Sequence, residues 1–287
     1  MKYSVQTDNV GAVHEALGSR CDIIRFGSEF CEWKIPSLKE LEEAYLLVDG
    51  DNKEFFYITP TVSNECLEKI RDQLAFLENK GEITVIVNDL GVLNIVEQFS
   101  NLKPHMGRQL VTILARTPWN QITEYDVGYM KKRRVSKVFY QTSVNYEPTI
   151  QLFKEHGAEG VDLDWISESI PNYSFISENG LSISVYLYLV PISVTRRCNM
   201  ARFLGEEEPK KCTKPCDTTA LFLEQKKIPG IDIFLLDNGV FRLTKPLSED
   251  INRLHRMRVE EFVIPMNPLT NIRTHDSIDK IIQTLRI

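Results

Sequence analysis

The sequence predicts a (β/α)8 TIM-like barrel with a small C-terminal appendage, on the basis of three observations. Short runs rich in β-branched and aromatic residues alternate with helix-patterned segments, the signature of parallel βα units. Eight such runs can be counted, and eight strands are what closes this kind of barrel. No glycine-rich dinucleotide fingerprint follows an early strand, which disfavours an open doubly wound sheet.

The eight predicted strands are short and lie, in chain order, at residues 3–7, 23–26, 55–59, 83–87, 109–114, 137–142, 160–164 and 183–190. Two of the helices between them have clear boundary signals. Ser37 and Glu40 form a capping-box pattern at the start of segment 37–48. Segment 64–79 is followed by Gly81, the residue type that commonly ends a helix.

The residues after position 216 do not fit another βα unit. Segments 231–236 and 240–243 flank Asp237-Asn238-Gly239, a strong hairpin signal. A short strand at 261–265 and an amphipathic helix at 277–285 follow. We therefore expect a barrel with the cysteine cluster over 1–216, and a hairpin and helix appendage over 217–287 that packs on the barrel.

Composition excludes several classes of protein. A chain of 287 residues suits one large α/β domain. Its net charge of −6 disfavours general nucleic-acid binding, which needs a basic surface. No signal core or apolar run of membrane-spanning length is found, so we expect a cytoplasmic protein with no membrane span. In that reducing compartment, clustered cysteines indicate metal binding or catalysis rather than disulfides.

Three of the six cysteines, Cys198, Cys212 and Cys216, lie close together in the sequence. Active sites of barrels form on the loops that follow the C-terminal ends of the strands. Cys31 follows the second predicted strand and Cys198 follows the eighth, and in a closed barrel only the first strand separates these two. The loops can reach over the same rim, so Cys31 is the predicted fourth thiol.

Four thiolates suit structural zinc or an iron–sulfur cluster. Zinc sites are usually built from two close cysteine pairs, whereas here one close pair is joined by a thiol well upstream and another from a distant loop. The scattered pattern favours a cluster, with zinc and the absence of any metal as open alternatives. Cys21 and Cys66 lie in poorly placed segments and are interpreted as small packing residues.

Four stretches occur in one consistent order: IRFGSEFC at 24–31, NDLGVLN at 88–94, GVDLD at 160–164, and RCNMAR at 197–202 with Cys212 and Cys216 behind it. Together they resemble the collagenase-like peptidase family of UbiU- and UbiV-type iron–sulfur proteins, most closely its UbiV-like members, over roughly residues 1–220. Such members take part in oxygen-independent ubiquinone biosynthesis.

The resemblance implies a (β/α)8-like barrel with one [4Fe-4S] cluster on Cys31, Cys198, Cys212 and Cys216. It also implies oxygen-independent hydroxylation of a quinone precursor or an RNA base, with prephenate or a similar anion as the oxygen donor. A UbiU-like paralogue would be the partner in a heterodimer. The family label adds peptidase activity as an alternative, although no Gly-x-Ser-x-Gly or His-Glu-x-x-His motif is present. A non-catalytic iron–sulfur scaffold subunit is a third possibility.

Three further residues are candidates for substrate chemistry. Asp162 and Asp164 alternate along one predicted strand and so point the same way. Two like carboxylates close together raise one pKa towards the general-acid range, unless that face pairs with helix cations instead. Arg116 is the candidate clamp for an anionic donor, because a guanidinium binds a carboxylate through two bonds. Its alternative is a surface arginine on a loop.

Overall fold

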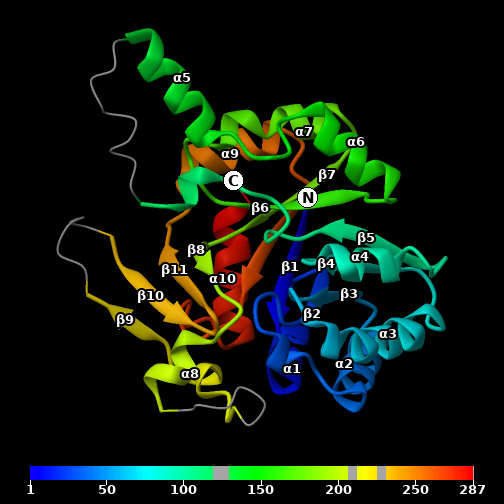
Figure 1. Ribbon diagram of the computed structural model, residues 1–287. Coiled ribbons are helices and arrows are strands. Elements are labelled where there is room, and N and C mark those ends of the chain that lie inside the picture. Colours follow the sequence, from blue (N-terminus) through cyan, green and yellow to red (C-terminus); the bar gives the residue numbers. More distant parts are fainter. Residues whose placement is uncertain (119–128, 206–211, 225–230, 287) are drawn as a thin grey trace.

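Eight parallel strands close a barrel in the order β1-β12-β7-β6-β5-β4-β3-β2, which confirms the predicted fold class. The computed structural model describes residues 1–118, 129–205, 212–224 and 231–286. Figure 1 shows the strands at the centre, with α2, α3 and α4 along one flank. Within these described ranges, no helix has the length and apolar character that crossing a membrane requires.

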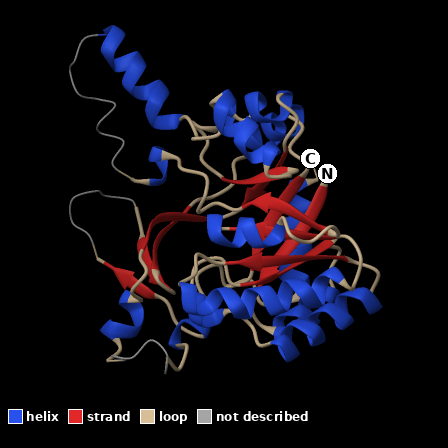
Figure 2. Ribbon diagram, turned by 45° about the vertical axis from the view of Figure 1, so that its right-hand side comes forward, coloured by secondary structure: helices blue, strands red, loops and turns tan. Residues whose placement is uncertain are grey.

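The barrel strands are β1 (Lys2–Thr7), β2 (Ile23–Gly27), β3 (Glu54–Thr59), β4 (Ile83–Val87), β5 (Leu102–Met106), β6 (Gly160–Asp164), β7 (Ser182–Tyr186) and β12 (Glu261–Pro265). A second, antiparallel sheet has the order β8-β11-β10-β9. Its strands are β8 (Leu189–Val194), β9 (Leu221–Leu223), β10 (Ile233–Leu236) and β11 (Gly239–Leu243). Figure 2 shows this sheet beside the barrel.

The α-helices of the described ranges are α1 (Val10–Leu17), α2 (Leu38–Gly50), α3 (Asn64–Glu78), α4 (Leu90–Val96), α5 (Tyr129–Tyr140), α6 (Glu147–Glu155), α7 (Ser174–Glu178), α8 (Asn199–Phe203), α9 (Ser248–Arg256) and α10 (His275–Leu285). The predicted capping box is confirmed at α2. Ser37 Oγ accepts a bond from the Glu40 N–H at 3.2 Å, and Glu40 Oε2 accepts one from the Ser37 N–H at 2.6 Å.

Two predicted strands are wrong. The fifth barrel strand is β5 rather than 109–114, a loop that ends in the short helix η2 (Leu114–Arg116). Val111 and Ile113 in that loop are buried, which gave it the apolar pattern of a strand. Segment 137–142 is the end of helix α5, followed by Thr142, which forms an isolated bridge with Ile113.

The eighth strand also comes from a different part of the chain. Segment 183–190 covers β7 and the start of β8, which diverge where Tyr188 adopts a left-handed conformation with φ of 65°. β8 joins the second sheet, and β12 fills the barrel position between β1 and β7. The barrel is therefore built from residues on both sides of position 216. Segment 217–287, which was expected to be an appendage, supplies the barrel strand β12 as well as helix α10.

The second sheet contains the hairpin that the sequence predicted. β10 and β11 pair antiparallel, with Leu236 opposite Gly239 across the turn. Asp237 in that turn has φ of 52°, a backbone conformation that Asp and Asn tolerate better than most residues. The turn lies against the barrel, because the Asn238 side-chain amide donates to the Phe30 carbonyl at 2.9 Å. The hairpin thus reaches the loop that contains Cys31.

Candidate functional site

The barrel lumen contains buried ion pairs. Arg25 on β2 is fully buried and binds Glu261 of β12 through two bonds, Nε to Oε1 at 2.7 Å and Nη2 to Oε2 at 2.6 Å. Its Nη1 donates to both oxygens of Asp162 on β6, at 2.9 and 3.0 Å. His105 Nε2 lies 2.9 Å from Asp162 Oδ1. Burying an arginine is tolerable here because its charge is paired on both sides.

A second arginine is buried nearer the C-terminal ends of the strands. Arg108 binds Glu29 through Nε and Nη2, at 2.8 and 2.6 Å, and Asp164 through Nη1 at 2.8 Å. Its guanidinium lies 3.7 Å from the centroid of the Tyr186 ring, a cation–π contact. Arg116 completes the group, since its Nε donates to Asp164 Oδ2 at 2.6 Å.

These contacts define the roles open to the predicted residues. Asp162 and Asp164 share the lumen face, as the alternation predicted. Burial alone would raise the pKa of Asp162, but Arg25 and His105 beside it lower that pKa below its usual range. Asp162 is therefore held as a carboxylate, whereas the sequence pattern had suggested a proton donor. Arg116 already donates to Asp164 and, through Nη2, to the Arg108 carbonyl at 2.8 Å.

Sequence reasoning missed the buried partners of these residues, Arg25, Glu29, His105, Arg108 and Glu261. One signal was available: Arg25 interrupts the apolar run of β2, all of whose residues are buried. A charged residue inside a strand that is buried on both faces needs a partner in the lumen.

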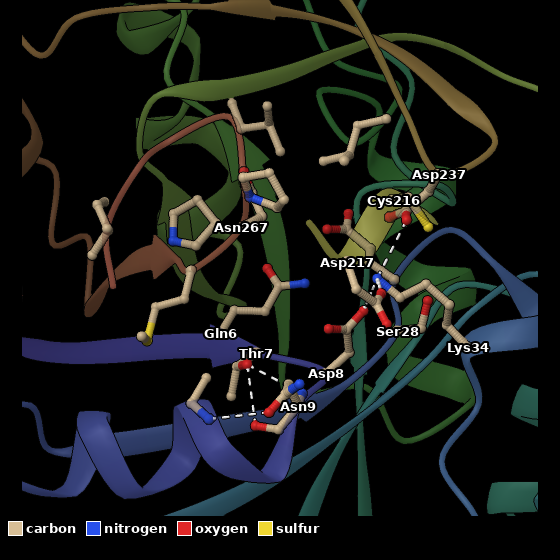
Figure 3. A pocket seen from close by; sticks show the side chains of 18 of the residues that line it. Gln6, Thr7, Asp8, Asn9, Ser28, Lys34, Cys216, Asp217, Asp237 and Asn267 are labelled. Carbon is tan, nitrogen blue, oxygen red and sulfur yellow. Dashed lines mark hydrogen bonds and ion pairs between the residues drawn. The ribbon is translucent and has the colours of Figure 1, made fainter. Parts of the chain in front are cut away.

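A cavity of about 370 Å³ opens at the C-terminal ends of β1, β2 and β12, where barrel enzymes bind their substrates. Figure 3 shows the amides of Gln6 and Asn267 at one part of this cavity and Cys216 at another. We call it the mouth cavity. Gln6 Oε1 is buried there without a hydrogen-bond partner in the described structure. Arg273, an exposed residue, also lines the mouth cavity and forms no ion pair with the described residues.

One buried lysine lines the mouth cavity together with Cys216. Lys34 belongs to the short helix η1 (Glu32–Lys34), directly after Cys31. Its Nζ forms ion pairs with Asp8, with Asp217 Oδ1 at 2.9 Å and with Asp237 Oδ1 at 3.3 Å. Burial raises the pKa of Asp8, an effect that the neighbouring Lys34 partly offsets. We call Lys34 and its three carboxylates the lysine cluster.

The structure brings the four predicted cysteine ligands to this same rim. Cys198 caps the N-terminus of α8, and Cys216 lies in the short helix η6 (Pro215–Asp217). Both are buried in one apolar cluster, against which Cys212 packs. Cys31 and Cys198 line a second cavity of about 130 Å³. No group of three or more His, Cys, Asp or Glu side chains in the described ranges is arranged to hold a metal ion.

Two of the sulfur atoms accept hydrogen bonds from backbone N–H groups, which favour the thiolate form. The Ala201 N–H donates to Cys198 Sγ at 3.4 Å and the Lys214 N–H donates to Cys212 Sγ at 3.4 Å. Burial raises the pKa of Cys31 to about 12, although the backbone of Trp33 acts to lower it. Backbone N–H donors stabilise the charged sulfur of a thiolate.

Asp237 links the remaining thiols. Its backbone oxygen accepts a bond from Cys198 Sγ at 3.1 Å. Burial, followed by Asp237, raises the pKa of Cys216. These thiols would have to release their protons to bind a metal, as metal-binding cysteines do. The four thiols share one rim and are the donor type of a thiolate-ligated centre, but within the described residues they are not arranged as a metal site.

No protein-family model matches the chain, and no curated protein matches its sequence. Solved structures with a similar fold include thiamine phosphate pyrophosphorylase from Pyrococcus furiosus, at 9% identity and a TM-score of 0.47, covering 99% of this chain and 94% of that one. A U32 peptidase is similar at 10% identity and 0.48, covering 93% of each chain. Orotidine 5'-monophosphate decarboxylase from Methanocaldococcus jannaschii has 10% identity and 0.48, covering 100% and 99%. Identities this low assign no activity.

Proposed function

We propose that the chain is an iron–sulfur protein that holds one [4Fe-4S] cluster on Cys31, Cys198, Cys212 and Cys216. The supporting observations are the backbone N–H bonds that Cys198 and Cys212 accept at their sulfur atoms and the cavity that Cys31 and Cys198 line together. Cys216 shares Asp237 with Cys198, so the fourth thiol belongs to the same neighbourhood. A cluster with four protein thiolates has no open coordination site and supplies electron transfer or structural support.

The mouth cavity is the proposed substrate site, because Cys216 lines it together with Gln6 and Asn267. The reaction class we propose is oxygen-independent hydroxylation of a quinone precursor or an RNA base, as the sequence resemblance implies. An anionic oxygen donor of the prephenate type would meet Arg273, whose guanidinium has no ion pair in the described structure.

Arg116 is not proposed for that role, because Asp164 already occupies its Nε. A UbiU-like partner subunit is part of the same proposal.

The decisive experiment is metal analysis of protein purified without oxygen. We expect iron and acid-labile sulfide in the wild type and an EPR signal after reduction. Cys31→Ala should lose most of the iron, because Cys31 comes from a loop distant in sequence and is not replaced by a neighbouring thiol. Cys21→Ala is the matched control, since Cys21 is also buried but lies before β2, at the opposite end of the barrel.

Other results of these measurements would refute the cluster or support a different function. A wild-type protein that stays free of iron after anaerobic reconstitution would refute the cluster. Zinc in place of iron would indicate that the four cysteines form a structural zinc site. Peptide cleavage that persists in Cys31→Ala would support the peptidase alternative, because the cluster would then be irrelevant to activity. Hydroxylation only in the presence of a second subunit would identify the chain as part of a heterodimer.

A further inference from the structure

Lys34 joins segments that are far apart in the sequence. Its side chain is 9% exposed, and its ammonium contacts Asp8 after β1, Asp217 in η6 and Asp237 in the β10–β11 turn. A lysine is seldom buried to this extent unless it is paired, and here a single nitrogen contacts three carboxylates. Figure 3 shows these groups directed towards one another at the wall of the mouth cavity.

The segment of Lys34 itself and two of the three segments paired with it, those of Asp217 and Asp237, also position a candidate ligand. Cys31 lies three residues before Lys34 and begins the same short helix. Cys216 directly precedes Asp217 in η6. Asp237 accepts the Cys198 thiol at its backbone oxygen. Removing the ammonium would leave three carboxylates facing one another, and their repulsion would separate these segments.

We propose that Lys34 is a positioning residue, which holds the segments of Cys31, Cys198 and Cys216 together and places a positive charge beside the Cys216 sulfur. The part that concerns a bound cluster rests on the proposed function. The part that concerns the thiols themselves does not, because the lysine cluster is formed by the polypeptide alone.

The first test needs no metal. In the apoprotein, iodoacetamide labelling followed by mass spectrometry measures how often each cysteine is exposed. Lys34→Met should make Cys216 react about tenfold faster, because local opening of the segment replaces its burial. Lys34→Arg should restore slow labelling, since a guanidinium can also pair with carboxylates. Lys39→Met, an exposed position on α2, is the matched control and should leave the Cys216 rate unchanged.

Cys21 serves as an internal reference for global unfolding, since it is buried at the other end of the barrel. If Lys34→Met labels Cys21 and Cys216 equally fast, the variant has unfolded and Asp217→Asn replaces it. That substitution removes only one carboxylate of the lysine cluster, the partly exposed one next to Cys216. Faster labelling of Cys216 alone would again support the proposal. Unchanged Cys216 labelling in folded Lys34→Met or in Asp217→Asn would overturn it.

The second test uses cluster-loaded protein. Reduction adds negative charge to the cluster, so loss of a nearby cation should lower the midpoint potential. We expect a lower potential in Lys34→Met, with an altered EPR spectrum of the reduced state, and recovery of both in Lys34→Arg. An unchanged potential would refute the electrostatic part of the proposal. A wild type that binds no iron would refute the proposed function, while the labelling result would still decide the role of Lys34.

Discussion

Two arginine side chains occupy a barrel lumen, a place that branched apolar residues usually fill in this fold. Arg25 and Arg108 are fully buried, and each guanidinium contacts two carboxylates. Their carboxylate partners lie on β6, on β12 and in the loop after β2, so the ion pairs connect opposite walls of the barrel. Such pairs do not guarantee stability, but breaking one leaves an uncompensated charge inside the protein.

We predict that Arg25→Met destabilises the fold by about 3–5 kcal/mol, because Asp162 and Glu261 would lose the cation they share. Urea unfolding monitored by circular dichroism measures this change. The control is Lys2→Met, which breaks an exposed ion pair to Glu54 and should cost less than about 1 kcal/mol. Equal effects of the two substitutions would show that the lumen pair contributes nothing beyond a surface pair.

The same carboxylates predict how stability depends on pH. Burial acts to raise the pKa values of Asp162 and Glu261, but Arg25 more than offsets it, so both lie below their usual values. Their contribution to the free energy of unfolding is therefore complete above about pH 5 and is lost as the pH falls through the folded-state values. In urea titrations, the stability difference between the wild type and Glu261→Gln should shrink on acidification. A difference that stays constant would contradict the assignment.

At the scale of the element, the end of β2 determines where the Cys31 loop begins. Gly27 has φ of 129°, and a Cβ atom there would overlap the backbone oxygen of Ile58 on β3. Only glycine lets the two strands approach this closely before the chain turns into the loop that contains Glu29 and Cys31. The position of the predicted fourth ligand thus depends on a backbone contact rather than on a side chain.

We predict that Gly27→Ala destabilises the protein by roughly 2–4 kcal/mol, because it combines an unfavourable φ with a clash against backbone. Gly81→Ala is the matched control: Gly81 also has a positive φ, of 106°, but nothing lies within 4 Å of its added Cβ. Urea unfolding of both variants separates the two effects. Similar losses in both would mean that the approach to Ile58 is unimportant.

Some of these elements have a local sequence pattern that predicts them, and others do not. Strands made of β-branched residues throughout, such as β4, were predictable from local residues alone. β5 was not, because Pro104 and His105 interrupt its pattern, and His105 is there to contact Asp162 in the lumen. The place of Cys31 at the rim was predictable because it follows β2, whereas the expectation that Cys198 follows a barrel strand was wrong, since β8 belongs to the second sheet. The partners of Arg25 were not, because they depend on strand neighbours that lie far apart in the sequence.

For the whole molecule, the closure of the barrel joins the two ends of the chain. β12 pairs with β1 and with β7, so a late segment completes a sheet that the first residues begin. Figure 1 and Figure 2 both show the N and C labels close together. The Arg286 guanidinium lies 5.4 Å from the centroid of the Tyr3 ring, which agrees with that view. Barrel integrity should therefore depend on the presence of β12 but not on the order in which the chain is connected.

Two altered chains test this dependence. A chain cut after Arg256 lacks β12 and α10, which leaves β1 and β7 with unpaired edges, and we expect no cooperative unfolding transition. A circular permutant that joins the ends by a short linker, with new termini opened beside Gly81, keeps every strand pair and should unfold cooperatively in urea. The permutant is the control for altered connectivity, because it moves the termini without removing a strand. A truncated chain that unfolds with the same sharp transition as the full chain would show that closure by β12 is dispensable.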